Sequence, residues 1–214
     1  MCNMSKILKQ CRKPTGWLGR SLARGMNISH SKMTDWGLNH ISTGEYATVL
    51  DIGCGGGGTI KKMSQIVTKG KIYGIDYSEE SVRISQKTNK GEIQAGRVEI
   101  RQGSVSSLPF PDDKFDLITA IETHYFWPDL VNDMKEALRV LKPCGTLIMM
   151  GGEYKGGKYD ERNQKWVELG DMTYHTVEEF KQLFSDVGLK AQVFEDYDKG
   201  WFCGVGKKPL SDGG

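Results

Sequence analysis

The stretch Val49–Gly58 constrains the fold of this chain more than any other segment. A short apolar run, interrupted by one aspartate, leads into five glycines within six residues, and a segment compatible with a helix follows. This order is typical of a strand that turns into a helix, where missing side chains let a ligand approach the backbone closely. The segment therefore predicts the first strand–helix unit of a ligand-binding α/β fold.

The rest of the chain repeats this alternation of short apolar runs and longer amphipathic segments. Such a rhythm favours a parallel sheet with helices on both faces. Seven strands are expected, at Ala47–Ile52, Lys71–Ile75, Val98–Arg101, Phe115–Ile121, Thr146–Met150, Lys190–Phe194 and Trp201–Gly206. Helices are expected at Thr59–Thr68, Glu79–Thr88, Leu130–Leu141 and Thr176–Val187. The sequence thus predicts an α/β domain.

Three further segments have less regular patterns. Thr176 and Glu179 have the spacing of a capping box at the start of a helix. Two helical patterns, Trp17–Arg24 and Lys32–His40, precede the first strand and are expected to form a lid over the sheet. Gly152–Asp171 lacks clear periodicity, so we expect a loop that covers the substrate side.

Composition narrows the class of protein. The 214 residues are 38% hydrophobic, which suffices for one domain with modest extensions. The five cysteines form no C-x-x-C pair, so no metal site is expected and a reducing, cytoplasmic compartment fits best. No apolar run approaches the ~18–20 residues of a membrane span, and Met1–Gly25 lacks the apolar block of a secretory signal.

The net charge of +2 is unevenly distributed. The first 34 residues contain seven basic side chains and no acid, which leaves 22 basic and 27 acidic residues in the remainder. A basic start of this kind is compatible with a nucleic-acid arm, a contact with anionic lipid, a transit peptide or a plain solvated segment. Of these interpretations, we favour the plain solvated segment.

The glycine spacing alone fits two classes of ligand. Gly53-x-Gly55-x-x-Gly58 satisfies the dinucleotide fingerprint, whereas Asp51-x-Gly53-x-Gly55-x-Gly57 satisfies the fingerprint for S-adenosylmethionine. A dinucleotide would place a pyrophosphate near Asp51 and be repelled, by roughly 1–4 kcal/mol at effective dielectric constants of ~80 to ~20. S-adenosylmethionine would place an ammonium and a sulfonium there. The carboxylate therefore favours the cationic ligand, although capping of the next helix remains an alternative role for Asp51.

A second acid follows the next expected strand. Asp76 ends the run Lys71–Asp76, 18 residues after Gly58, where a carboxylate can accept both hydrogen bonds of a ribose diol. Nicotinamide enzymes share this feature, so Asp76 indicates an adenosyl ligand without separating the two classes. A helix cap for the segment that starts near Glu79 is the alternative.

The order of motifs resembles a known family. Gly103–Ile118 contains Leu108-Pro109-Phe110 and Phe115-Asp116-Leu117-Ile118. Together with the glycine loop, this block resembles the class I S-adenosylmethionine-dependent methyltransferases, in the type 11-like group that acts on small molecules. The likeness spans roughly Ala47–Met150. Lys142–Ile148 also resembles the family's turn into the fifth strand, with Cys144 in place of a glycine.

The resemblance implies a fold, a domain layout and a set of cofactor residues. The fold is a Rossmann-like, seven-stranded, mostly parallel sheet with helices on both faces and an antiparallel last strand. Residues 1–44 would form a basic helical lid, 45–208 the methyltransferase domain and 209–214 a tail. The cofactor residues would be Asp51, Gly53, Cys54, Gly55, Gly57, Asp76, Tyr77, Gly103, Ser104, Val105 and Ile121. Many relatives have aspartate where this chain has Ser104, and a hydroxyl accepts a hydrogen bond from the adenine amino group more weakly.

The segment after the fourth strand is expected to face the methyl acceptor. His124 is the predicted general base, with a loop or capping histidine as the alternative. Tyr125, Trp127, His30 and Trp36 are expected in the lid or acceptor pocket, with plain packing as the alternative. The segment lacks the Asn/Asp-Pro-Pro-aromatic run that resembles enzymes acting on nucleic-acid bases. A small-molecule acceptor is therefore expected, with a protein or RNA acceptor as the less favoured alternative.

Three classes of function remain open on these residues. A methyltransferase that yields S-adenosylhomocysteine is the leading prediction. A nicotinamide-dependent oxidoreductase and a non-catalytic adenosyl-binding or nucleic-acid-binding module are the alternatives. The sequence specifies neither the oligomeric state nor the acceptor atom.

Overall fold

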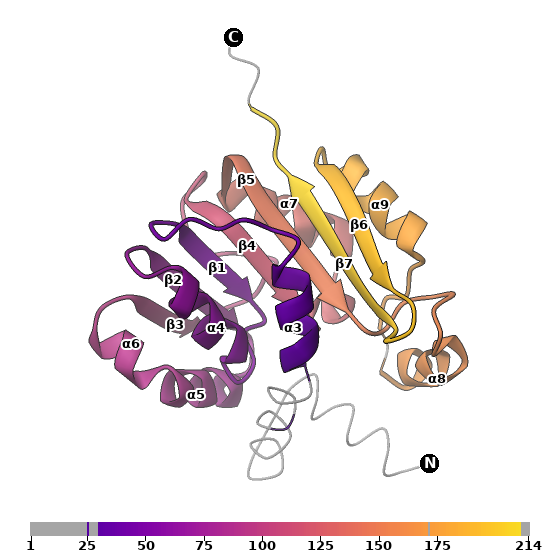
Figure 1. Ribbon diagram of the computed structural model, residues 1–214, viewed down its shortest axis with the longest axis horizontal. Coiled ribbons are helices and arrows are strands. Elements are labelled where there is room, and N and C mark those ends of the chain that lie inside the picture. Colours follow the sequence, from indigo (N-terminus) through magenta and orange to yellow (C-terminus); the bar gives the residue numbers. More distant parts are fainter. Residues whose placement is uncertain (1–24, 26–29, 171, 211–214) are drawn as a thin grey trace.

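The computed structural model describes residues 25, 30–170 and 172–210, which form one seven-stranded sheet flanked by helices (Figure 1). The strands are β1 (Thr48–Ile52), β2 (Lys71–Asp76), β3 (Val98–Gln102), β4 (Phe115–Ile121), β5 (Leu141–Gly151), β6 (Lys190–Asp196) and β7 (Trp201–Lys207). The longer helices are α3 (Ser31–Leu38), α4 (Gly58–Ile66), α5 (Glu79–Thr88), α7 (Leu130–Val140), α8 (Asp160–Gly170) and α9 (Val177–Asp186). The shorter ones are α6 (Lys90–Gln94) and the 3₁₀ helix η1 (His124–Phe126).

The strand order is β3-β2-β1-β4-β5-β7-β6. The first five strands in chain order pair in parallel, and β7 is antiparallel to both β5 and β6. The predicted Rossmann-like sheet with its antiparallel last strand is therefore confirmed. The chain reverses its direction of winding between β1 and β4, and in open α/β sheets this switch point is where ligands bind.

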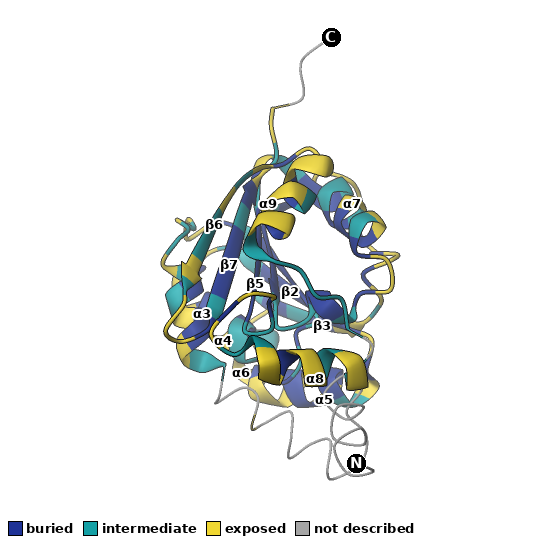
Figure 2. Ribbon diagram, turned by 90° about the vertical axis from the view of Figure 1, so that its right-hand side faces the viewer, coloured by how far each residue is buried: buried dark blue, intermediate teal, exposed yellow. Residues whose placement is uncertain are grey.

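Helices cover the two faces of the sheet in separate groups (Figures 1 and 2). On one face α3, α4 and α5 contribute Met33, Ile60, Met63 and Val82 to a buried cluster with the strands. On the other face α7 and α9 contribute Met134, Ala137, Phe180 and Phe184 to a second cluster. The strands β1, β2 and β4 are buried almost throughout. Strands buried on both sides have near-continuous apolar sequences, which explains why these three were recognisable.

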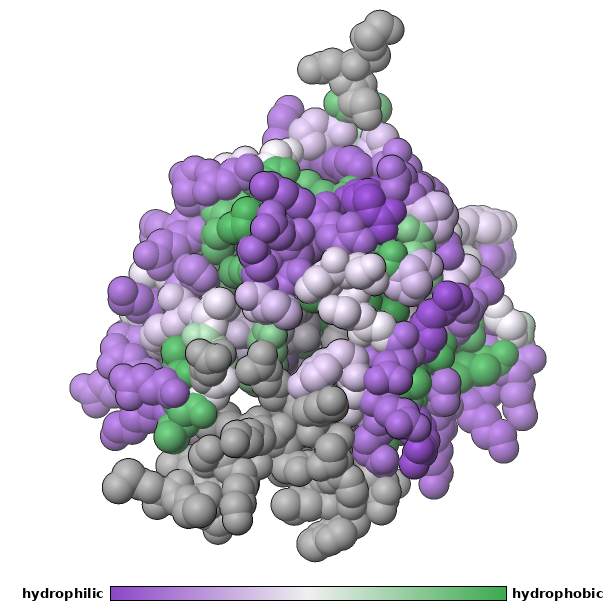
Figure 3. Space-filling view, turned by 180° about the vertical axis from the view of Figure 1, so that it is seen from behind, coloured by the Kyte–Doolittle hydropathy of each residue, from purple (hydrophilic) through white to green (hydrophobic). Residues whose placement is uncertain are grey.

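The outer sides of α7 and α9 are largely hydrophilic in the view from behind (Figure 3). Their buried residues recur at helical spacing, as Leu130, Met134 and Ala137 do in α7. These helices are therefore held by one apolar stripe each.

Side-chain caps fix where the helices begin. Ser78 accepts a hydrogen bond from the Ser81 N–H at the start of α5. Thr176 and Glu179 form both bonds of the predicted capping box at α9, and this prediction is confirmed.

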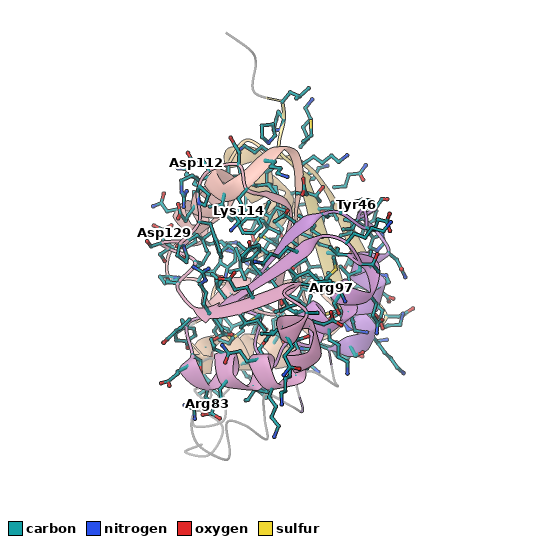
Figure 4. The ribbon with its side chains drawn as sticks, turned by 90° about the vertical axis from the view of Figure 1, so that its left-hand side faces the viewer. Tyr46, Arg83, Arg97, Asp112, Lys114 and Asp129 are labelled. Atoms are coloured by element: carbon teal, nitrogen blue, oxygen red, sulfur yellow. The ribbon has the colours of Figure 1, made fainter. Side chains whose placement is uncertain are left out.

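One arginine closes the far end of α4. The Arg97 guanidinium donates to the carbonyls of Ser64, Val67 and Thr68 at 3.3, 3.1 and 3.4 Å, and it pairs with Glu92. Last-turn carbonyls lack partners within a helix, so this arginine satisfies them and ties the helix to β3. Arg83, by contrast, projects from the outer side of α5 (Figure 4).

The structure corrects two expectations. Gly152–Asp171 was expected as a loop, but it contains α8, in which Asn163 is the only buried residue among those described. A helix that buries no apolar stripe has no apolar period to detect. The fifth strand also begins at Leu141 rather than Thr146, because a register shift opposite Phe115–Leu117 lets the strand continue through Pro143.

The predicted helix Trp17–Arg24, and most of the basic segment, lie outside the described residues. The second N-terminal helix is present as α3 and packs against β5 and β7. Among the described residues, no helix is long and apolar enough to cross a membrane.

Candidate functional site

A cleft of about 500 Å³ lies at the carboxyl ends of the parallel strands. Its walls come from the ends of β1, β2 and β4, from the loops after β3 and β5, and from residues of α3, α4 and α8. This is the position that the strand order assigns to a ligand site.

The glycine loop forms the floor of the cleft between β1 and α4. Gly53 has a φ of 70°, and a Cβ at this position would lie 2.1 Å from the Thr123 hydroxyl oxygen. Gly55 has a φ of 50°, and a Cβ there would meet nothing closer than 3.9 Å. The first glycine is needed for packing against Thr123, in the segment that follows β4, while the second leaves backbone without a side chain facing open space.

Asp51 lies under this loop with one oxygen free of hydrogen bonds. The side chain is 2% exposed. Its Oδ1 accepts a 2.6 Å hydrogen bond from the Thr119 hydroxyl, and its Oδ2 is buried without a partner among the described residues. Burial raises the pKa of Asp51 to about 7. A buried carboxylate with an unused oxygen at a cleft wall suits a cationic ligand group.

Asp76 joins the loops that follow β1 and β2. Its Oδ2 accepts a 2.9 Å bond from the Gly55 N–H, and its Oδ1 accepts a 2.8 Å bond from the Ser78 N–H. Burial raises the pKa of this carboxyl, against the opposing effect of these backbone donors. The Ser81 hydroxyl also hydrogen-bonds to this carboxyl. A carboxylate has about four acceptor sites, so Asp76 keeps capacity for a ribose hydroxyl.

Other predicted cofactor residues also line the cleft: Tyr77, Gly103, Ser104, Val105, Cys54 and Ile121. The Ser104 hydroxyl oxygen accepts a 3.2 Å bond from the Ser106 N–H, so it is partly used within its own turn. Gly57 is the exception among the predicted cofactor residues. It lies outside the cleft lining at the start of α4, where a Cβ would meet the Asn89 amide nitrogen at 2.4 Å.

Three of the four residues predicted for the lid or acceptor pocket line the cleft. These are His30, Tyr125 and Trp127. Trp36 does not, because its ring packs on His40 and Trp201 with centroid distances of 4.9 and 6.0 Å.

The predicted base, His124, does not line the cleft. Its side chain is 1% exposed and packs edge-on against Phe180 and Phe202 at 5.0 and 5.4 Å. Neither ring nitrogen has a hydrogen-bond partner among the described residues, and burial lowers the pKa to about 3. Such an imidazole is neutral near pH 7 and is a weak base, so its catalytic role stays a prediction without geometric support.

Two glutamates that the sequence analysis did not single out do line the cleft. Glu122 follows β4 with a φ of 56°, which is uncommon for a residue other than glycine. Its Oε1 accepts a 2.7 Å bond from the Gly152 N–H, and its Oε2 accepts a 2.5 Å bond from the Tyr125 hydroxyl. Glu153 follows β5, and burial together with the adjacent Glu122 charge raises the pKa of Glu153 well above its usual range.

A signal for these residues was present in the sequence. Acids occur at or just after the ends of four parallel strands, as Asp51, Asp76, Glu122 and Glu153. Parallel strands end at the same edge of the sheet, so four acids in these positions are expected to lie close together at that edge.

The cleft fits an adenosyl ligand with a cationic tail. The bare backbone at Gly55 permits close approach, Asp76 can hold a ribose diol, and the unpartnered oxygen of Asp51 suits an ammonium. A pyrophosphate would meet the Asp51 carboxylate instead of a donor.

Comparison with known proteins points the same way. The family described as Methyltransferase domain matches residues 50–149. The chain is 28% identical to 27-O-demethylrifamycin SV methyltransferase of Amycolatopsis mediterranei over 155 residues, which are 69% of this chain and 56% of that protein. It is 31% identical to demethylmenaquinone methyltransferase of Bacillus licheniformis over 122 residues, which are 56% of this chain and 51% of that protein. The chain thus spans about half the length of these curated relatives.

The fold also matches solved structures. One is a chain of the complex between the Haloferax volcanii Trm112 methyltransferase activator and a methyltransferase, with a TM-score of 0.80 and 23% identity. The match covers 88% of this chain and 94% of that chain. At this identity the likeness concerns the fold.

Proposed function

Because the chain belongs to the class I S-adenosylmethionine-dependent methyltransferases, we propose that it transfers a methyl group from this cofactor to a small-molecule acceptor and releases S-adenosylhomocysteine. The observation that carries the proposal is the buried Asp51 carboxyl, whose free oxygen lies beside the bare glycine loop. That combination favours a ligand that is adenosyl at one end and cationic at the other.

The proposal assigns the cleft residues as follows. The backbone from Gly53 to Gly55 and the Asp51 carboxylate hold the methionine end. Asp76 holds the ribose, and Tyr77 with the segment Gly103–Val105 borders the adenine. These assignments are supported by their shared position along the cleft and by the hydrogen-bond capacity left on each acid.

The cofactor supplies a methyl group on a sulfonium, which is a good leaving group. This chain's residues would then bind and orient the acceptor in line with that group and exclude water. The rings of Tyr125 and Trp127, which are both buried, provide an apolar wall at the β4 side of the cleft.

Binding calorimetry tests the cofactor assignment. We expect S-adenosylmethionine to bind and NAD to give no heat, since NAD would bring a pyrophosphate against Asp51. The Asp76→Asn variant should bind S-adenosylmethionine about tenfold more weakly, because it loses a charge-assisted acceptor for the ribose diol.

The matched control is Asp198→Asn, at a carboxyl whose side chain is 92% exposed. It should bind like the wild type. Binding of NAD without binding of S-adenosylmethionine would contradict the proposal and favour the oxidoreductase. Binding of S-adenosylmethionine with no release of S-adenosylhomocysteine on any acceptor of a broad screen would favour the binding module.

A further inference from the structure

The cleft extends past the residues assigned to the cofactor. Glu122 and Glu153 follow β4 and β5, which lie on the opposite side of β1 from β2 and β3. We call this part of the cleft the acceptor compartment and define it by Glu122, Glu153, Tyr125, Trp166, Met172 and His30, all of which line the cleft. Its residues come from four separate segments of the chain.

The two carboxyls of this compartment differ in how they are held. Both oxygens of Glu122 accept hydrogen bonds, from the Gly152 N–H and the Tyr125 hydroxyl. Glu153 Oε2 is buried without a partner among the described residues. Glu122 is therefore anchored, while Glu153 offers an oxygen to whatever occupies the compartment.

Burial and mutual repulsion control the charge of this pair. Burial raises the pKa of Glu122 and of Glu153, and the two carboxyls interact directly. Two carboxyls this close do not both ionise readily, so the pair retains one proton and one negative charge near neutral pH. The hydrogen bond between them favours the protonated form of Glu153 and the ionised form of Glu122, so the proton lies on Glu153 and the negative charge on Glu122.

Positive groups nearby do not cancel that charge. Lys62 lines the cleft but forms an ion pair with Asp35 at 2.5 Å. Burial lowers the pKa of His30, which leaves it neutral near pH 7. The Arg162 guanidinium offsets part of this charge, since its field lowers the pKa of both glutamates, but it donates to the Asn163 side chain rather than to either carboxyl.

We propose that the acceptor compartment binds the protonated amine of a small acceptor, with Glu153 accepting a hydrogen bond from the nitrogen. The inference rests on the proposed function and names the acceptor class for the same cleft. The aromatic rings of Tyr125 and Trp166 suit a cation, because a ring face attracts an ammonium and the carbons beside it. An anionic acceptor would be repelled by the pair.

The same carboxyl can prepare the amine for methylation. An N–H proton of the bound ammonium passes to Glu153 while the proton that Glu153 shares with Glu122 moves onto the Glu122 carboxylate, which leaves a lone pair on nitrogen. That lone pair forms the new N–C bond to the methyl carbon while the C–S bond breaks, and its electron pair stays on sulfur. The methylated nitrogen then carries the positive charge, and the glutamate pair returns the extra proton to solvent when the product leaves.

Three matched probes test this specificity. Phenethylamine, 2-phenylethanol and phenylacetate share a ring and chain but present an ammonium, a hydroxyl and a carboxylate. Ligand-detected NMR titrations on the full chain saturated with S-adenosylhomocysteine give the affinity of each. We expect phenethylamine to bind at least about tenfold more tightly than phenylacetate, and the double variant Glu122→Gln/Glu153→Gln to remove most of that preference because it removes the negative charge of the pair.

Glu161→Gln is the control variant, because Glu161 is an exposed residue of α8 outside the acceptor compartment. It should retain the preference. Glu122→Gln and Glu153→Gln each leave one carboxyl, so each single variant should retain part of the preference. Thermal melts check that each variant is folded.

The outcomes separate the two proposals. Failure of the wild type to bind S-adenosylmethionine or S-adenosylhomocysteine overturns the proposed function. Normal cofactor binding combined with equal affinity for the three probes, with no binding of any probe, or with an amine preference that survives Glu122→Gln/Glu153→Gln overturns the acceptor inference alone.

Discussion

Asp51 gives the cofactor half of the site its pH dependence, because burial raises the pKa of this carboxyl to about 7. A cationic ligand binds the ionised form and so pulls a proton off Asp51. We therefore predict that the affinity for S-adenosylmethionine rises as the pH increases from about 6 to 8. Calorimetry in buffers of different ionisation enthalpy should show proton release on binding below pH 7. An affinity independent of pH in the wild type would contradict this role.

The same shift predicts how Asp51 affects stability without ligand. A carboxyl whose pKa is raised in the folded state gives its full stability at pH values below its unfolded pKa, near 4, and loses it as the pH rises through about 7. Asp51→Asn should therefore unfold like the wild type near pH 4 and be about 2–4 kcal/mol more stable at pH 8. Urea titrations at both pH values measure the difference, with Asp198→Asn as the exposed control. A variant less stable at pH 8 would show that the carboxylate is structurally required.

At the scale of elements, Arg97 shows how one side chain holds a helix to the sheet. Arg97→Ala leaves the carbonyls of Ser64 and Val67 without their donor at the end of α4. We expect a loss of about 1–3 kcal/mol in the free energy of unfolding. Arg83→Ala should cost at most about 0.5 kcal/mol, because Arg83 is exposed and its ion pairs are with Glu79 and Glu80 on its own helix. Chemical denaturation of both variants makes the comparison, and equal losses would contradict the capping role.

The elements also show what the sequence could and could not predict. The sequence located β4 and α5 to the residue, because an apolar run and a capped amphipathic pattern mark their ends. It missed α6, which has no buried residue, and α8, which buries little. The periodicity of apolar residues reflects which side chains are buried. A helix that buries few apolar side chains therefore shows no clear period in its sequence.

The residues of the candidate site were likewise predicted only in part. The Asp51 and Asp76 positions followed from local motifs, and both side chains line the cleft. His124 was chosen because it follows β4, but the backbone of η1 directs its ring toward Phe180 instead. The direction of a side chain in an irregular turn depends on tertiary packing, which spacing along the sequence does not encode.

At the scale of the whole molecule, the cleft joins parts that are otherwise connected mainly through the sheet. Its lining includes residues at the ends of three neighbouring parallel strands and residues of helices that belong to one face of the sheet. A ligand that contacts all of these binds the folded chain only, because unfolding separates them. Its binding free energy is therefore added to the stability of the entire domain.

This coupling predicts a large thermal shift with the intact cofactor. At a concentration of 100 times Kd, S-adenosylmethionine should add about 2.7 kcal/mol and raise Tm by roughly 5–10 °C for a chain of this size. Adenosine and methionine added together as separate molecules should raise Tm much less, since each contacts one half of the cleft and each pays its own cost of association. Differential scanning calorimetry distinguishes the cases. An equal shift from the separate halves would show that the glycine loop and the Asp76 side of the cleft bind independently, and would contradict a single ligand spanning both.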